Sequence, residues 1–212
     1  TPTSDPLIAG KYILMPKTST YARGVDALRK AGKTPFTFKE NLQARVEAYE
    51  SGDHSLFDTW LDSCTGIVYK KGTTKFKIVP NCTELRGIPA DFSQAFMPVE
   101  YAKIEGIELD SGTKIIRKTA KYNTLLTKAE VLEHPAWLAA AEEDKVVLRA
   151  YTDIVFAAYA EKHSKTDKLM GFYVRQNTET DELRAVFVHG LISSSFAYGR
   201  GNLGSNGRFL RR

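Results

Sequence analysis

Cys64 and His189 are the residues of this chain whose chemistry best suits covalent catalysis. A cysteine thiolate is a strong nucleophile, and a histidine can take its proton when the two side chains lie within hydrogen-bonding reach. Cys64 stands before an apolar stretch, and His189 ends the run 186–189 (Val-Phe-Val-His) of a predicted strand. One of the two functions that the sequence leaves open is therefore a thiol hydrolase with Cys64 as the nucleophile and His189 as the base.

The segment that begins at Cys64 resembles the nucleophile region of NlpC-type cell-wall endopeptidases. The resemblance covers residues 64–68 (Cys-Thr-Gly-Ile-Val). It implies a papain-like fold in which Cys64 is the nucleophile and a downstream histidine, here His189, is the base. That family has aspartate directly before the cysteine, whereas Ser63 separates Asp62 from Cys64 in this sequence. The family also sets its cysteine at a helix N-terminus, while the pattern here places Cys64 at the entrance of a strand.

The sequence predicts neither a metal ion nor a cofactor. His54, Asp58 and Asp62 follow one another at helical i, i+4 and i+8 spacing, so a helix would place them on one face, where they could bind a metal. The same spacing describes the solvated face of an amphipathic helix, and we interpret it so. Residues 199–204 (Gly-Arg-Gly-Asn-Leu-Gly) match a dinucleotide-binding pattern, but no helix or acidic residue follows them at the required spacing.

Basic residues concentrate in two places and suggest the other function, binding without catalysis. The chain has 30 lysines and arginines against 25 acidic residues, and most of the excess lies in residues 198–212, which contain no acid. Guanidinium groups bind phosphates and aromatic rings stack on bases, so we expect a polyanion such as nucleic acid as the partner. A protein partner or a second copy of the chain is the alternative. The predicted binding residues are the tail arginines Arg200, Arg208, Arg211 and Arg212 and the hairpin lysines Lys70, Lys71, Lys75 and Lys77.

These lysines belong to a hairpin whose register can be predicted. Two alternating segments flank the turn residues 72–73 (Gly-Thr), and glycine in the first position suits a two-residue hairpin turn. This turn pairs Tyr69 with Phe76 and gathers the apolar side chains of both strands on one face. In the same register Cys64 and Cys82 project to opposite sides, so we expect two free thiols.

Capping and periodicity predict the other elements. Thr37 and Glu40 have the spacing of a capping box, which predicts that a helix begins there. A long amphipathic helix is expected from Pro135 to His163, since Pro135 suits a first helical turn and apolar residues recur on one face after it. Further helices are expected over 22–31, 56–61 and 127–133, and strands over 11–16, 104–116, 170–176, 183–191 and 194–198.

These elements predict an α+β fold in a single domain, with a mostly antiparallel sheet and one long amphipathic helix packed on it. We place the globular domain at 1–197 and a basic Gly/Arg-rich C-terminal tail at 198–212. A chain of 212 residues with 42% hydrophobic and 26% charged residues is globular in composition. The longest apolar run, 154–160, is too short to span a membrane. Because no secretory signal opens the chain and cysteines are few, we expect a soluble cytoplasmic protein without a membrane partner.

Of the two functions, the sequence favours a non-catalytic binding protein that uses the tail and the lysine-bearing hairpin. The alternative is the papain-like thiol hydrolase with Cys64 and His189. The hydrolase requires the two side chains to meet, and sequence spacing does not bring them together.

Overall fold

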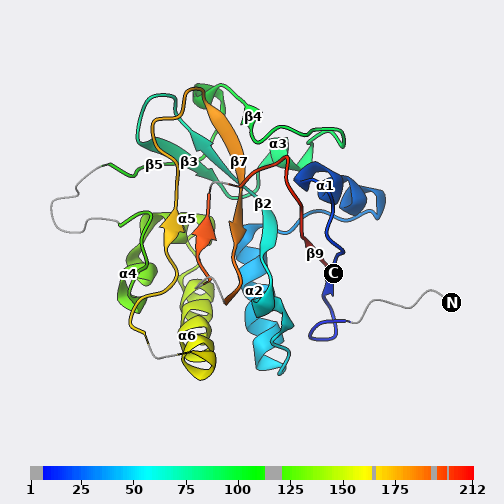
Figure 1. Cartoon of the computed structure of the whole chain (residues 1–212), viewed down its shortest axis with the longest axis vertical. Coiled ribbons are helices and arrows are strands. Elements are labelled where there is room, and N and C mark those ends of the chain that lie inside the picture. Colours follow the sequence, from blue (N-terminus) through cyan, green and yellow to red (C-terminus); the bar gives the residue numbers. More distant parts are fainter. Residues whose placement is uncertain (1–6, 113–120, 164–165, 192–194, 200) are drawn as a thin grey trace.

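The computed structural model describes residues 7–112, 121–163, 166–191, 195–199 and 201–212. Within these residues a seven-stranded sheet has the order β5-β3-β2-β7-β8-β6, with β4 also paired to β7 (Figure 1). Its pairs are antiparallel except for β6 with β8. The strands are β1 (Ile13–Leu14), β2 (Leu61–Tyr69), β3 (Lys75–Val79), β4 (Met97–Pro98), β5 (Ile107–Asp110), β6 (Phe172–Tyr173), β7 (Glu182–Val188), β8 (Ala197–Tyr198) and β9 (Leu210–Arg211).

Helices α2 and α6 cover one face of this sheet and share a core with it, while α1 and α3 pack on part of the other face. Helix α2 lies against β2 and β7, and α6 packs on α2 (Figure 1). Leu148, Tyr151 and Val155 of α6 are buried in the same core as Ile67 of β2 and Val186 of β7. The predicted α+β fold with a mostly antiparallel sheet is thus confirmed. The helices are α1 (Tyr21–Lys30), α2 (Phe38–Glu50), α3 (Thr83–Arg86), α4 (Lys128–Glu133), α5 (Pro135–Ala140) and α6 (Lys145–Lys162), with the 3-10 turns η1 (Ser55–Asp58) and η2 (Tyr101–Lys103).

The β2–β3 hairpin has the register that its turn predicts. Tyr69 is paired with Phe76 and Ile67 with Ile78. Gly72 adopts a φ of 64°, a left-handed conformation that glycine takes without the penalty of a Cβ atom. Tyr69 and Phe76 are both buried in the main core, so their shared face is the inner one.

The start of α2 also follows its sequence signal. The Thr37 side chain accepts from the backbone N–H of Glu40 at 3.2 Å, and the Glu40 carboxylate accepts from the backbone N–H of Thr37 at 2.8 Å. The capping box is therefore present, and it satisfies two backbone donors at the helix end. The capping box fixes the start of α2 at Phe38. Helix α2 in turn supports the centre of the sheet.

Two predicted helices differ from the structure. The helix expected from Pro135 to His163 is broken between Ala140 and Lys145, where Glu142 and Glu143 take φ angles of 56° and 59°. Asp144 starts a new helix there, because its side chain accepts from two backbone N–H groups of the first turn. The helix expected over 56–61 is only the short turn η1, which ends at Asp58, and Leu61 already belongs to β2.

Residues 201–212 pack on the rest of the chain. Strand β9 pairs with β1, so Leu210 lies opposite Leu14, and Gly207 forms a bridge with Thr18. Phe209 is buried against Tyr21, with their ring centroids 5.1 Å apart. The described part of the basic tail is therefore attached to its own domain. The candidate binding site forms where this segment crosses the central strands.

Candidate binding site

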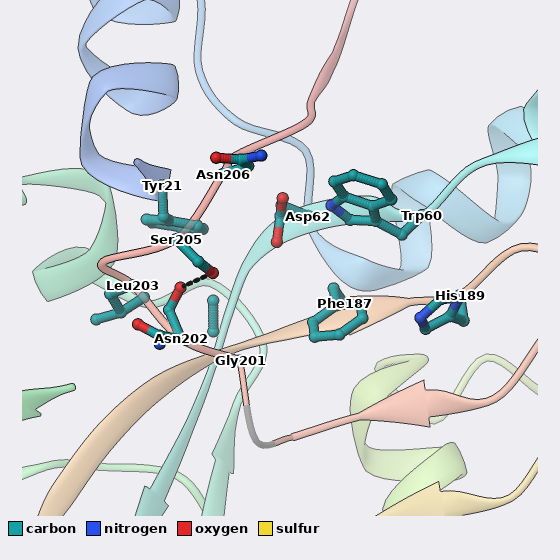
Figure 2. Close-up of a pocket in the computed structure, with 11 residues that line it drawn as sticks. Tyr21, Trp60, Asp62, Phe187, His189, Gly201, Asn202, Leu203, Ser205 and Asn206 are labelled. Atoms are coloured by element: carbon teal, nitrogen blue, oxygen red, sulfur yellow. Dashed lines mark hydrogen bonds between the residues drawn. The ribbon is translucent and has the colours of Figure 1, made fainter. Parts of the chain in front are cut away.

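One face of the β2–β7 ladder brings together four side chains that are far apart in the sequence. Asp62 pairs with Phe187 across the ladder, and the alternation of side chains along a strand puts Trp60 and His189 on the same face. Phe187, His189 and Trp60 are half-buried, and Asp62 is only 7% exposed. Figure 2 shows the four side chains along one side of a hollow in the surface.

The C-terminal segment forms the opposite wall. The hollow is a pocket of about 430 Å³, which is within the usual range for ligand sites, and the first turn of α1 closes one side. A side-chain Cβ at Gly201 would lie 2.5 Å from the backbone oxygen of Ala185, so the segment crosses β7 too closely for any other residue. The glycine-rich motif therefore permits close backbone packing. The lining residues are Tyr21, Trp60, Asp62, Ala185, Phe187, His189, Gly201, Asn202, Leu203, Ser205 and Asn206.

Asp62 connects this wall to the sheet. Its carboxylate accepts from the backbone N–H of Arg208 at 2.8 Å, and its own N–H donates to the backbone oxygen of Arg208 at 2.8 Å. Burial raises the pKa of Asp62 to about 7, although hydrogen bonds from Arg208 and the Trp60 side chain act in the opposite direction. The carboxyl group thus titrates near neutral pH inside the pocket.

Arg45 of α2 holds the far end of the site from inside the protein. Its guanidinium donates to the backbone oxygens of His189 and Thr59 and to the Tyr151 hydroxyl, each at 2.7 Å. Arg45 is fully buried and its guanidinium lies over the ring of Phe57, 5.4 Å from the centroid. These contacts fix the chain on both sides of the Trp60–His189 edge, so the pocket walls are set by the core.

A cluster of aromatic side chains continues from the pocket across the outer face of the sheet. Phe187 pairs with Tyr198 on β8, with ring centroids 5.1 Å apart, and His189 lies 4.8 Å from Phe196. Every ring of the cluster is half-buried, while the alternate residues of the same strands face the core. We call this set the aromatic cluster; it comprises Tyr173, Phe187, His189, Phe196 and Tyr198.

The structure does not bring Cys64 to His189. Cys64 lies in β2 with 1% of its surface exposed, and its thiol contacts the backbone oxygen of Pro35 at 3.3 Å and the Asn81 side chain. Burial raises the pKa of Cys64 to about 12, which is opposite to what a nucleophile at neutral pH requires. His189 lines the pocket instead, and Cys64 does not. Cys64 and Cys82 are both free thiols, as the hairpin register predicted.

The lysines of the hairpin have several contacts of their own. Lys75 pairs with Glu108 at 3.2 Å. The Lys77 ammonium donates to the backbone oxygens of Tyr101 and Ile104 and lies 4.4 Å from the Tyr101 ring centroid. Lys70 and Lys71 are exposed at the turn. None of the four lines the pocket.

The tail arginines are spread along the C-terminal segment. Arg208 is attached to Asp62 through its backbone, and its guanidinium lies 6.0 Å from the ring centroid of Trp60. Arg211 belongs to β9, and Arg212 lies over the rings of Tyr12 and Phe36. Arg200 lies outside the described residues. Of the three tail arginines that the structure describes, Arg208 is the one beside the pocket.

His54, Asp58 and Asp62 do not share a helical face, because the helix ends at Asp58 and Asp62 is in a strand. Among the described residues there is no group of three or more histidine, cysteine or acidic side chains arranged to hold a metal ion. In the same part of the chain, no helix is long and apolar enough to cross a membrane.

Comparison with known proteins bears on the fold. No protein-family model matches the sequence, and no curated protein matches it. A solved structure described as "Accommodation of massive sequence variation in Nanoarchaeota by the C-type lectin fold" does match, with a TM-score of 0.69 and 16% sequence identity over 96% of this chain and 99% of that one. The fold of this chain is C-type lectin-like. At this level of identity the similarity is one of architecture.

A C-type lectin-like fold is not papain-like, so the fold implied by the resemblance at residues 64–68 is wrong. The physical reason lies in β2, where Cys64 is an interior strand residue and not the first residue of a helix. The short motif matched in residue types, but its surroundings do not activate a thiol.

Sequence reasoning missed most of the pocket. The alternation of 186–189 does place Phe187 and His189 on one face of a strand. Trp60 was expected on a helix, and nothing in the local sequence pairs Asp62 with Phe187, which is far away along the chain. The sequence feature that could have indicated the pocket wall is the composition of residues 198–207. Apart from Arg200 and Leu203, these residues are glycine, asparagine, serine and tyrosine.

Proposed function

We propose that this chain is a non-catalytic binding protein whose ligand is another polypeptide, seated on the pocket and the adjoining aromatic cluster. The observation that carries the proposal is the side-by-side placement of half-buried rings and a segment rich in asparagine, serine and glycine. Aromatic side chains provide large contact area at small entropic cost, and short polar side chains provide adaptable hydrogen bonds. The same mixture is typical of surfaces by which antibodies bind proteins.

The polar wall offers hydrogen-bonding groups to a ligand. Asn202 is exposed, and its side-chain oxygen accepts from the backbone N–H of Gly204 at 2.9 Å. Ser205 and Asn206 are exposed at the rim. A peptide backbone has both donors and acceptors, so it matches this wall while apolar side chains cover the rings.

The similar structure supports a binding role in a second way. It is described as accommodating massive sequence variation in the C-type lectin fold. In this chain, too, the pocket rim is made of exposed side chains on a segment whose backbone is held by β9, by Asp62 and by close packing on β7. Side chains of the rim can therefore differ without altering the core beneath them.

A polyanion remains the second proposal, supported by Arg208 and Lys17, which both lie over the ring of Trp60 at the pocket edge. The geometry favours it less than a polypeptide. Lys75 and Lys77 are engaged within the domain, and none of the hairpin lysines lines the pocket. Nucleic-acid binding of this kind would weaken steeply as salt rises.

The test is a selection of random dodecapeptides, displayed on phage, on the immobilised full chain. We expect enriched peptides whose affinity falls at least about tenfold for Phe187→Ala, which removes a ring shared by the pocket and the aromatic cluster. Asn206→Ala changes an exposed rim residue without touching the core and is expected to weaken binding severalfold. Val146→Ala is the matched control, because Val146 is an apolar residue of α6, 80% exposed, outside the pocket.

Peptides that bind the wild type, Phe187→Ala and Asn206→Ala equally, or a selection without enrichment, would contradict the proposal. A fluorescent oligonucleotide is measured in parallel at low and near-physiological salt. Salt-sensitive oligonucleotide binding without peptide enrichment would favour the polyanion. Self-association of the free chain in sedimentation that is lost with Phe187→Ala would identify a second copy as the polypeptide partner.

A further inference from the structure

We infer that the pocket accepts a cationic side chain of the partner, a lysine ammonium or an arginine guanidinium group, and that Asp62 is the residue that binds it. The inference rests on the proposed function, because it describes one contact of the proposed polypeptide partner. It begins from the position of Asp62, whose carboxyl group projects between Tyr21 and Trp60 beside the ring of Phe187 (Figure 2).

The carboxylate of Asp62 has acceptor capacity that the described residues do not use. An ionised carboxylate offers about four lone-pair positions. The backbone N–H of Arg208 and the Trp60 side chain donate to it. The remaining positions suit a group rich in donors, and an ammonium has about three N–H bonds and a guanidinium about five.

The charge of Asp62 is also uncompensated within the described part of the chain. No ion pair between described residues includes Asp62. A buried carboxylate without a counter-charge is unfavourable, and a bound cation would remove much of that cost. A carboxylate ligand would add a second negative charge beside it, so the pocket discriminates between the two signs.

The aromatic walls favour a cation as well. The face of an aromatic ring attracts ammonium and guanidinium groups, and tryptophan does so most strongly. Trp60 already attracts two such groups of the chain itself, since the Lys17 ammonium lies 4.6 Å and the Arg208 guanidinium 6.0 Å from its ring centroid. Neither Lys17 nor Arg208 lines the pocket, so Phe187 and the inner edge of Trp60 stay available to a ligand.

The other titratable groups around Asp62 are few. His189 shares the pocket, and burial together with the nearby Arg45 lowers its pKa, so it is neutral at pH 8. The Tyr21 hydroxyl donates to the backbone oxygen of Ser63 at 2.8 Å and stays protonated. The basic side chains near the pocket are Lys17 and Arg208, which lie over the ring of Trp60. Asp62, whose pKa is about 7, therefore changes its charge between pH 5.5 and 8, and a variant of His189 tests the contribution of that residue.

The experiment uses the full chain and follows the indole N–H signals by NMR. Trp60 reports on the pocket, and Trp137, which is buried and donates to the backbone oxygen of Met170 at 2.9 Å, is the internal reference. The probes are n-butylammonium and n-butylguanidinium, with n-butanol as the neutral control. We expect saturable shifts of the Trp60 signal by the two cations at pH 8, at least about tenfold weaker binding at pH 5.5, and no saturable shift with butanol.

Two variants separate the contributions. Asp62→Asn keeps the shape and the acceptor for Arg208, and we expect it to reduce cation binding at pH 8 to the level of the wild type at pH 5.5. His189→Gln is expected to preserve most of the pH dependence. Equal binding of the cations by Asp62→Asn, or equal binding of butanol, would overturn the inference. The selected peptides distinguish the two proposals, because peptides that need Phe187 but bind Asp62→Asn unchanged leave the proposed function standing and refute the cation site alone.

Discussion

Asp62 serves both the fold and the candidate site. Its reciprocal hydrogen bonds with Arg208 attach the C-terminal segment to β2, and its carboxyl group faces the pocket. A group in this position is nearly desolvated, and desolvation is the largest influence on its pKa. Protonation of Asp62 therefore affects how firmly the C-terminal segment, which forms the second pocket wall, is attached to the sheet.

Replacing Asp62 should change how stability depends on pH. The pKa of Asp62 is about 7 in the folded protein and 3.8 as a free side chain. Because the folded pKa is raised, its stabilising effect is complete below about pH 4 and is lost as the pH rises through 7. Asp62→Asn should therefore be more stable than the wild type at pH 8, by on the order of 2–4 kcal/mol. The stability of the variant should not fall as the pH rises through 7 in the way expected for the wild type.

Urea unfolding of both proteins at pH 4, 6 and 8 measures the effect. The difference in the free energy of unfolding should grow from pH 4 to pH 8. Parallel pH profiles for the wild type and Asp62→Asn would show that the carboxyl group is not desolvated as described.

At the scale of elements, the site depends on a close crossing of the C-terminal segment over β7. Gly201 makes this crossing possible, while Asp62 holds the segment at Arg208 and the β1–β9 pairing holds it at Leu210 and Arg211. Glycine is required at position 201 by proximity to the Ala185 oxygen. The position of the pocket wall is thus determined by backbone contacts, whereas its chemistry is determined by the side chains of Asn202, Ser205 and Asn206.

Gly201→Ala should push the segment away from β7, because the new Cβ would lie 2.5 Å from a backbone oxygen that the sheet holds in place. We expect a loss of about 1–3 kcal/mol in the free energy of unfolding and weaker binding of the selected peptides. Gly87→Ala is the control, since its Cβ would lie 3.4 Å from the Thr83 oxygen and the φ of Gly87 is −92°. Equal effects of both substitutions would contradict the close crossing.

Local signals predicted several elements well. The turn at Gly72 and the alternation on both sides of it predicted the register of the β2–β3 hairpin, and Thr37 with Glu40 predicted the start of α2. The break between α5 and α6 was missed, because residues 142–145 (Glu-Glu-Asp-Lys) contain no glycine or proline and apolar residues stand on both sides of them. Trp60 was assigned to a helix, since the spacing of its apolar neighbours suits a helix as well as an extended segment.

At the scale of the whole molecule, the pocket joins residues from α1, β2, β7 and the C-terminal segment. Strand pairs that are far apart along the chain cannot be identified from a single sequence, because the alternation of each strand is compatible with many partner strands. The cysteine–histidine hypothesis failed for the same reason. Residue types suited to catalysis were present, and the topology placed Cys64 in the interior and His189 at the pocket.

The reactivity of the thiols should report on the integrity of the whole fold. Cys64 and Cys82 are buried, and burial raises the pKa of each to about 12. Iodoacetamide at pH 7.5 should therefore label the native protein slowly at both positions, and rapidly in urea above the unfolding midpoint. Rapid labelling of Cys64 in the native protein, located by mass spectrometry, would contradict its burial and revive the nucleophile hypothesis.

The closure of the pocket by residues 201–211 has a consequence during synthesis. Strands β2 and β7 can pair as soon as residue 188 has left the ribosome, and that pairing alone brings Asp62 beside Phe187. Until the following residues emerge, the rings of Trp60 and Phe187 face solvent with no second wall, and the β1 edge lacks its partner strand. A nascent chain halted in this interval would expose an apolar surface and an unpaired strand edge to which chaperones bind. Pairing of β9 with β1 would then cover this surface and displace the chaperone.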